Sequence, residues 1–166
     1  NGVTFKNNTA LAGGAISART ASVLNLTDVK FLNNATPKAE VSTTNGGGAI
    51  YAGYGSLTLS GCTLDGNKTD YYGGAITAHG TTTEIKDGTV VKNSTGTTGA
   101  AFDFRHEGTA KLDTISILDN TATGNGVVYI TGGTTLEMKN VTATGNEAYQ
   151  GGVLYASGTA KATVSG

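Results

Sequence analysis

Several residue types that stabilise other kinds of protein are scarce in this chain of 166 residues. Tryptophan is absent, and proline, cysteine and methionine each occur once. The single cysteine, Cys62, excludes an intramolecular disulfide, so packing must stabilise the fold. No apolar run approaches the roughly 20 residues that a membrane-spanning helix needs. No signal peptide is visible at the start of the chain.

Charge is sparse as well. Only 14% of the residues are charged, and the formal net charge is −1. No polybasic segment is present, which argues against electrostatic binding to nucleic acid or to anionic lipid. The chain begins at Asn1 rather than at a methionine, and its pattern stops midway at Gly166. We therefore expect it to be a piece of a longer protein.

Glycine is plentiful, with 26 residues, and threonine, asparagine and alanine are also common. Glycine, threonine and asparagine are poor residues for the interior of a helix. The composition instead favours many short strands that are joined by tight turns.

An internal repeat organises the whole chain. Asparagines recur at spacings of 26, 33, 26, 27 and 26 residues, at Asn8, Asn34, Asn67, Asn93, Asn120 and Asn146. A period of this length is the signature of a repeat architecture, in which each unit covers the apolar face of its neighbours.

Apolar residues return at fixed distances before each of these asparagines. Three residues before lie Phe5, Phe31, Leu64, Val90, Ile117 and Ala143, and five before lie Val3, Val29, Cys62, Gly88, Ile115 and Val141. Eight and ten residues before, similar columns begin at Leu26 and Leu24. Within each pair the apolar positions are two residues apart, as in strands with one buried face.

A glycine pair marks a third strand in each repeat. The clean copies are Gly13-Gly14-Ala15-Ile16, Gly47-Gly48-Ala49-Ile50 and Gly73-Gly74-Ala75-Ile76. In the fifth copy Asn125 stands in place of the first glycine. Glycine and asparagine both tolerate positive φ, so this position is predicted to adopt a left-handed turn.

These patterns predict an all-β fold, a right-handed parallel β-helix of about six coils with three short strands in each. Residues 1–166 are expected to form one β-helix segment. The 33-residue repeat has extra residues, which are predicted to bulge from one turn as an inserted loop over 35–46. The six asparagines are predicted to stack as an internal ladder of side-chain amides.

The repeats resemble a known family. Phe5-Lys6-Asn7-Asn8 and Phe31-Leu32-Asn33-Asn34 have the form FxxN, and three repeats contain the sequence GGAI. Paired GGAI and FxxN motifs are similar to those of the chlamydial polymorphic membrane proteins and related adhesin-like proteins. The resemblance covers the whole chain. It implies a β-helix that is displayed on a cell surface and takes part in adhesion.

Outward positions of the strand after the glycine pair suggest one candidate site. The register of the repeats places His79, Asp103 and Arg105 near Tyr129 on one face. A carbohydrate-active β-helix would need acids and bases grouped on such a face. The simpler interpretation is an exposed ion pair between Asp103 and Arg105 beside a solvated turn.

Tyrosines suggest a second candidate site. Tyr51, Tyr54, Tyr71 and Tyr72 gather near the inserted loop. Exposed aromatic rings can stack on sugars or anchor a protein partner, although they can also shield the edge of a coil.

The leading functional prediction is a secreted or surface-displayed adhesin or stalk that binds a glycan or protein on a host or neighbouring cell. The alternative is a polysaccharide lyase or hydrolase with Asp103, Arg105 and His79 as its catalytic residues. We expect no cofactor, no metal, no nucleic acid and no membrane insertion of this segment, and an extracellular location. End-to-end stacking with further coils is a further expectation.

Overall fold

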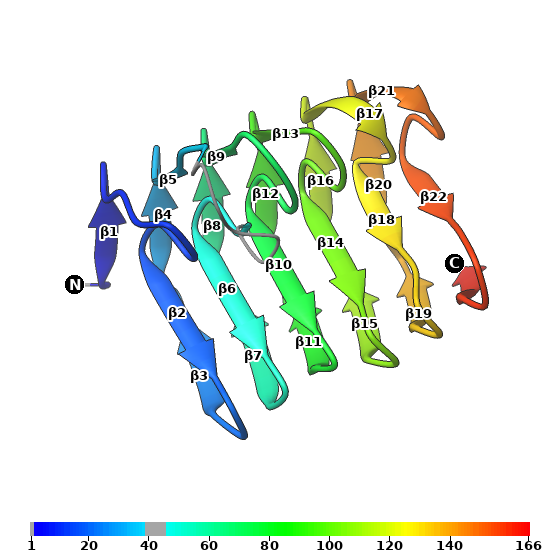
Figure 1. The fold of residues 1–166 in the computed structure, drawn as a ribbon, viewed down its shortest axis with the longest axis horizontal. Helices are drawn as coiled ribbons and strands as arrows, with labels where there is room; N and C mark the ends of the chain where they lie inside the picture. The colour runs from blue at the N-terminus through cyan, green and yellow to red at the C-terminus, as the bar shows by residue number, and fades with distance from the viewer. Residues whose placement is uncertain (1, 39–45) are drawn as a thin grey trace.

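The computed structural model describes residues 2–38 and 46–166, and all regular elements in these residues are β-strands. Successive coils stack side by side from the N-terminal end to the C-terminal end (Figure 1). In the described residues, the strands pair in parallel, and each pairing joins one coil to the next. The predicted parallel β-helix is therefore confirmed. Among the described residues, no helix is long and apolar enough to cross a membrane.

Three six-stranded sheets form the walls of the solenoid. Sheet 1 contains β1 (Thr4–Lys6), β4 (Lys30–Leu32), β8 (Thr63–Asp65), β12 (Val90–Lys92), β16 (Ser116–Leu118) and β20 (Thr142–Thr144). Sheet 2 contains β2 (Ile16–Arg19), β6 (Ile50–Gly53), β10 (Ile76–His79), β14 (Phe102–Arg105), β18 (Val128–Ile130) and β22 (Leu154–Ala156). Sheet 3 contains β3 (Val23–Thr27), β7 (Ser56–Ser60), β11 (Thr82–Lys86), β15 (Thr109–Asp113), β19 (Thr135–Lys139) and β23 (Lys161–Ser165).

A fourth sheet of short strands lies between sheets 1 and 2 along the chain. Sheet 4 contains β5 (Ala35–Thr36), β9 (Lys68–Thr69), β13 (Thr95–Gly96), β17 (Thr121–Asn125) and β21 (Glu147–Gln150). The sequence predicted three strands in each coil and missed this one. Three of its strands, β5, β9 and β13, have only two residues and show no alternation of polar and apolar positions, so periodicity did not reveal this sheet.

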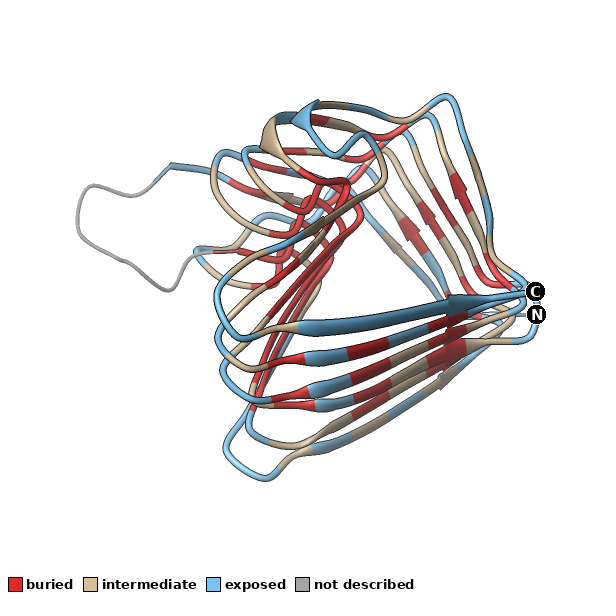
Figure 2. Ribbon diagram, turned by 90° about the vertical axis from the view of Figure 1, so that its right-hand side faces the viewer, coloured by how far each residue is buried: buried red, intermediate tan, exposed pale blue. Residues whose placement is uncertain are grey.

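The core is a column of apolar side chains inside the three main walls. Viewed along the solenoid, buried residues (red) lie along every wall of the stack (Figure 2). Phe31, Leu64, Ile76, Leu112 and Ile117 are fully buried in this column. Each such side chain contributes about 1.5–3 kcal/mol relative to exposure. Cys62 lies in the same core, as its inward position predicted.

The glycine pair has the predicted left-handed turn in most coils. The first glycine has a φ of +60° at Gly13, +69° at Gly47, +62° at Gly73 and +59° at Gly99. In the fifth coil the positive φ belongs to Gly126, at +51°, and Asn125 is the last residue of β17. The prediction for Asn125 was wrong, because the chain makes its turn one residue later there.

The asparagine ladder exists, but one of its predicted members does not belong to it. Asn34 Nδ2 donates to Asn67 Oδ1 at 3.1 Å, and Asn120 Nδ2 donates to Asn146 Oδ1 at 3.0 Å. Asn8 joins the first group through a 2.9 Å bond to Asn34 Oδ1. The amides of Asn34, Asn67, Asn120 and Asn146 also donate to backbone carbonyl oxygens, as when Asn120 Nδ2 donates to Val91 at 3.0 Å.

Asn93 is the exception and requires a correction. It is exposed, its φ is +51°, and its side chain bonds to Asp65. Ser94 is the buried residue at the ladder position. The turn before β12 contains one extra residue, so Val91 rather than Val90 pairs with the inward Leu64. Counting by a fixed offset from Asn93 therefore placed β12 and the ladder residue of the fourth coil one residue out of register.

Candidate functional site

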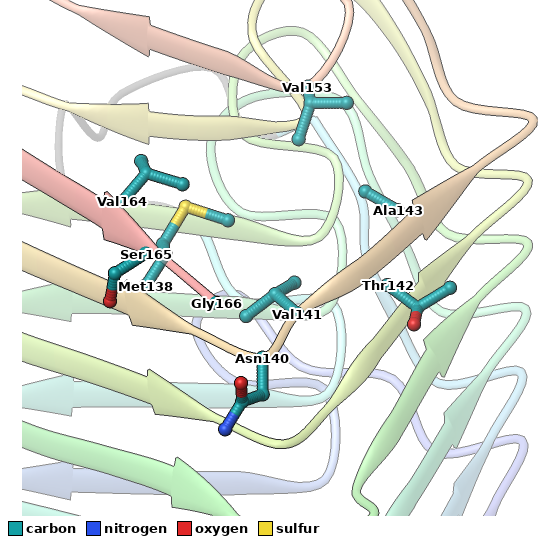
Figure 3. A pocket seen from close by; sticks show the side chains of 9 residues that line it. All are labelled: Met138, Asn140, Val141, Thr142, Ala143, Val153, Val164, Ser165 and Gly166. Carbon is teal, nitrogen blue, oxygen red and sulfur yellow. The ribbon is translucent and has the colours of Figure 1, made fainter.

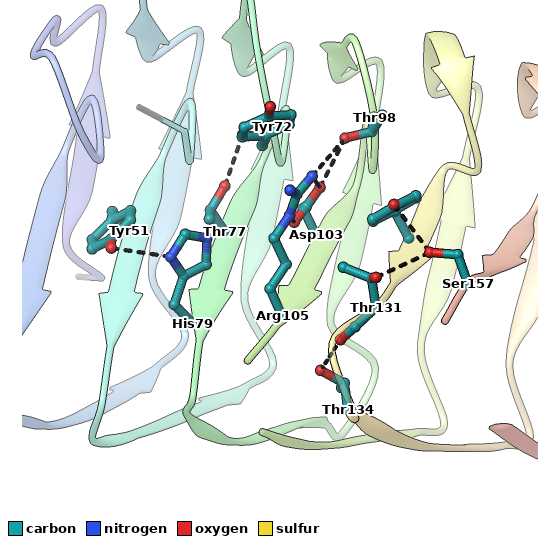
Figure 4. Close-up of polar contacts among 11 residues, drawn as sticks. Tyr51, Tyr72, Thr77, His79, Thr98, Asp103, Arg105, Thr131, Thr134 and Ser157 are labelled. Atoms are coloured by element: carbon teal, nitrogen blue, oxygen red, sulfur yellow. Dashed lines mark hydrogen bonds and ion pairs between the residues drawn. The ribbon is translucent and has the colours of Figure 1, made fainter. Parts of the chain in front are cut away.

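The candidate site lies on the outer face of sheet 2. Strand pairing places Asp103 beside Thr77 on one side and Tyr129 on the other, and it places His79 beside Arg105. The predicted juxtaposition of these side chains is confirmed, and Figure 4 shows them along one face.

The segments that precede the sheet 2 strands cover part of this face. Thr77 Oγ1 donates to the backbone carbonyl of Tyr72 at 2.7 Å, and Thr98 Oγ1 donates to Asp103 Oδ2 at 2.9 Å. Outward positions that would face solvent on a bare sheet are buried as a result. Thr77 and Asp103 are 0% exposed.

Asp103 and Arg105 form a buried ion pair, and the prediction of an exposed pair was wrong. Arg105 Nε and Nη2 both donate to the Asp103 carboxylate, the second at 2.8 Å. The Arg105 side chain is only 19% exposed. Burial raises the pKa of Asp103 against the opposing effect of Arg105. Burial has the largest single effect on the pKa of Arg105 and would lower it, but the hydrogen bonds and opposite charge of Asp103, together with Tyr72 and Tyr129, raise it.

Aromatic rings continue from this ion pair along the solenoid. The Arg105 guanidinium lies 3.8 Å from the centre of the Tyr72 ring and 5.1 Å from that of Tyr129. Tyr129 in turn stacks on Tyr155, with ring centres 5.6 Å apart and planes 6° apart. Arg105 thus lies between the Tyr72 ring, in the segment that precedes β10, and the Tyr129 ring, on β18 of the next coil.

A second cluster lies closer to the N-terminal end of the same face. The Arg19 guanidinium is 4.5 Å from the centre of the Tyr51 ring, and the Tyr51 hydroxyl is 3.3 Å from His79 Nδ1. The His79 ring meets the His106 ring edge-on, with centres 4.9 Å apart. Burial, together with the nearby His106, Arg105 and Arg19, lowers the pKa of His79 to about 4. His79 is therefore uncharged at neutral pH.

The four tyrosines predicted to bind a ligand differ in exposure. Tyr54 is 62% exposed, whereas Tyr51 is only 4% exposed, so the prediction of an exposed Tyr51 was wrong. Tyr71 and Tyr72 are half-buried, and their ring centres are 6.3 Å apart. The predicted inserted loop over 35–46 includes residues 39–45, which lie outside the described residues.

Sequence reasoning missed Arg19, His106 and Tyr149 as possible members of a site. Arg19 and His106 could have been found, because Arg19 is at the register position of His79 and Arg105, and His106 is the second of only two histidines. Tyr149 is 81% exposed on β21. Tyr149 could not have been found from the repeat, because the sequence did not reveal the strand on which it lies.

Two hollows lie away from this face. One, of about 530 Å³, opens at the C-terminal end of the stack among Met138, Val141, Val153 and Val164 (Figure 3). It continues the apolar interior that Leu112 and Ile117 fill in the coils before it. The other, of about 370 Å³, is lined by Lys68, Asp70 and several threonines beside sheet 4. Across residues 2–38 and 46–166, no three His, Cys, Asp or Glu side chains converge as a metal site would require.

The model of the family described as "Right handed beta helix region" matches residues 1–166. No curated protein and no solved structure matches the chain significantly. The match covers the entire chain and agrees with the parallel coils and inward columns described above. The chain belongs to the right-handed β-helix family.

Proposed function

We propose that this β-helix is a surface-displayed, adhesin-type binding segment, and that it recognises a glycan on the outer face of sheet 2. One observation carries the proposal. Six of the seven tyrosines, both histidines and both arginines lie on sheet 2 or in the segments that flank its strands, and the seventh tyrosine, Tyr149, lies on β21 of sheet 4. The outward positions of sheets 1 and 3 carry mainly threonine, serine, lysine and acidic residues. Such one-sided placement is typical of a recognition surface.

The exposed parts of these side chains suit a sugar. The Tyr129 ring stacks on Tyr155 and is half-buried, so it offers a ring edge and a hydroxyl group, whereas Tyr51 is too deeply buried to contribute. Tyr54 is the exposed ring of this group and is available for stacking on a pyranose. A glycan needs both a ring platform and hydrogen-bonding groups, and the face supplies both.

Binding fits the geometry better than catalysis does. Hydrolysis of a glycosidic bond normally needs two carboxyl groups that reach the substrate from opposite sides. Asp103 is the one carboxylate among the outward residues of the described sheet 2 strands, and it is fully buried against Arg105. A lyase or hydrolase that uses Asp103, Arg105 and His79 is the second candidate, favoured by their adjacency on one face.

Display on a cell surface follows from the resemblance of the GGAI and FxxN repeats to the chlamydial polymorphic membrane proteins. We infer an extracellular location and a partner on a host or neighbouring cell. Both inferences are part of this proposal.

The experiment compares two exposed tyrosines. Binding to a glycan array and attachment to cells would be measured for the wild type, Tyr54→Ala and Tyr149→Ala. We expect Tyr54→Ala to weaken binding by about tenfold or more, as loss of an aromatic anchor does. Tyr149→Ala is the matched control because Tyr149 lies on β21 at the other end of the stack. Neither change should alter the free energy of unfolding by more than about 0.5 kcal/mol.

The outcomes separate the candidates. Equal binding by the two variants, or no binding by the wild type, contradicts the proposed site. Release of sugar products by the wild type and its loss in Asp103→Asn would favour the enzyme.

A further inference from the structure

The two ends of the stack expose apolar side chains. Among the described residues, five of the six exposed large apolar side chains lie in the first coil (2–27) or the last coil (141–166): Val3, Leu11, Val23, Tyr149 and Val164. Val164 pairs with the inward Met138 and lines the hollow of about 530 Å³ at the C-terminal end (Figure 3). The last strand, β23, is exposed at all of its positions. Each end therefore presents apolar surface that the inner coils bury against their neighbours.

One column of residues beside sheet 4 shows the difference between end coils and inner coils. The parallel pairings run in register from Thr9 to Glu147, and the residues two positions after each paired residue are Leu11, Pro37, Asp70, Thr97, Thr123 and Tyr149. The inner coils have a proline, an aspartate or a threonine in this column. The end coils have Leu11 and Tyr149, which are 60% and 81% exposed. Two copies stacked end to end would bring Tyr149 of one beside Leu11 of the other and remove both from water.

The hydrogen bonds of the ladder run in one direction. Asn34 donates through its backbone N–H and Nδ2 to Asn67 Oδ1 in the following coil. Asn120 donates in the same way to Asn146, and Asn8 donates to Asn34. By the same geometry, Asn146 presents N–H donors at the C-terminal end of the stack, and Asn8 presents its Oδ1 at the N-terminal end. Two identical ends would place donors against donors or acceptors against acceptors, whereas opposite ends match.

We propose that two copies of this chain bind head to tail, with the first coil of one copy stacked on the last coil of the other. In the register of the other coils, β23 pairs with β3 so that Val164 lies beside Leu26, and Asn146 donates to Asn8. Gly2 and Gly166, both exposed, meet in the turn between sheets 3 and 1, where the lack of side chains limits the backbone shift that stacking needs. The contact joins two different surfaces and leaves one of each open, so further copies can add. This association does not depend on the proposed glycan site.

Analytical ultracentrifugation of the 166-residue chain tests the association. Between about 1 μM and about 1 mM, we expect the weight-average mass to rise steadily and to exceed that of a dimer, because an open contact has no limiting size. A mass that stays at the monomer, or that stops at the dimer, would overturn the head-to-tail contact.

Two variants block one end each. Val3→Lys with Leu11→Lys places lysines at the N-terminal end, and Tyr149→Lys with Val164→Lys places them at the C-terminal end. All four side chains are more than half exposed in the single chain, so both variants should fold and unfold in urea like the wild type. Each variant alone should associate at least about tenfold more weakly than the wild type, because the contact would bury charges without partners.

A mixture of the two variants distinguishes opposite ends from identical ends. One variant keeps an unchanged C-terminal end and the other an unchanged N-terminal end, so an equimolar mixture should form a heterodimer and no larger species. Tyr54→Lys is the matched control, since Tyr54 is the exposed large apolar side chain outside the end coils, and it should associate like the wild type. A mixture that stays monomeric, or a variant that dimerises alone, would contradict the proposal.

Discussion

The backbone N–H of Ser94 donates to the side-chain oxygen of Asn120 at 2.9 Å. The same kind of bond joins the backbone N–H of Asn34 to the side-chain oxygen of Asn67 at 3.0 Å, two steps earlier in the ladder. Serine is too short to continue the ladder, and its hydroxyl instead donates to the carbonyl of Lys92 in its own coil. The described ladder is thus two groups of stacked amides, with Asn67 and Asn120 facing the gap.

Replacing Asn120 should lower the free energy of unfolding strongly, whereas replacing Asn93 should have little effect. Asn120→Gly removes the acceptor of the Ser94 N–H and the donor to Val91, and it leaves a cavity. We expect a loss of about 2–4 kcal/mol in the free energy of unfolding. The same substitution at Asn93 should change it by less than about 0.5 kcal/mol, because Gly66 and Gly145 already hold this left-handed position in other coils. Urea unfolding of both variants measures the difference. Similar losses would mean that the ladder runs through Asn93.

Ser94→Asn should join the two halves of the ladder. Asparagine occupies the equivalent buried position at Asn67 and Asn120, so the interior accommodates this side chain. One additional buried hydrogen bond to Asn120 Oδ1 should raise the free energy of unfolding by about 1 kcal/mol. Thermal and urea unfolding provide the measurement. A destabilised variant would indicate that the fourth coil is packed too tightly to hold the amide.

Much of this fold could be predicted from the sequence, because each coil repeats the same buried pattern. Leu64 and Ile117 were assigned inward from spacing alone, and both are fully buried. The fourth coil was misread because Val90 and Val91 are both apolar, so either could have been the inward residue. The pattern also could not show that outward positions are covered. Burial of Asp103 depends on a segment that carries Thr98, whose position only the folded chain reveals.

The ion pair between Asp103 and Arg105 should show strong energetic coupling. Asp103→Leu leaves a largely buried guanidinium without its carboxylate, and Arg105→Met leaves a fully buried carboxylate without its cation. Each single change should cost about 3–5 kcal/mol. The double variant should cost less than the sum, since no unpaired charge remains in the interior. A double-mutant cycle by chemical unfolding gives the coupling energy. Additive losses would show that the two side chains do not depend on each other.

The low pKa of His79 predicts a specific dependence of stability on pH. The folded protein binds a proton at this ring only near pH 4, whereas the unfolded chain does so near the ordinary value of 6.5. Between these values the unfolded state holds more protons than the folded state, so stability falls as the pH falls. At 1.36 kcal/mol per pKa unit, the shift amounts to a loss of about 3 kcal/mol by pH 4, complete only below the folded pKa.

His79→Gln isolates this contribution, because the amide does not titrate. Asp103, whose pKa is raised by burial, contributes in the opposite direction as the pH falls, and its effect is present in both proteins. The difference between the wild-type and His79→Gln unfolding free energies, measured by urea unfolding from pH 7 to pH 4, therefore reports His79. We expect the wild type to lose stability relative to the variant over this range. A difference that stays constant with pH would mean that His79 takes up a proton as readily in the folded protein as in the unfolded chain.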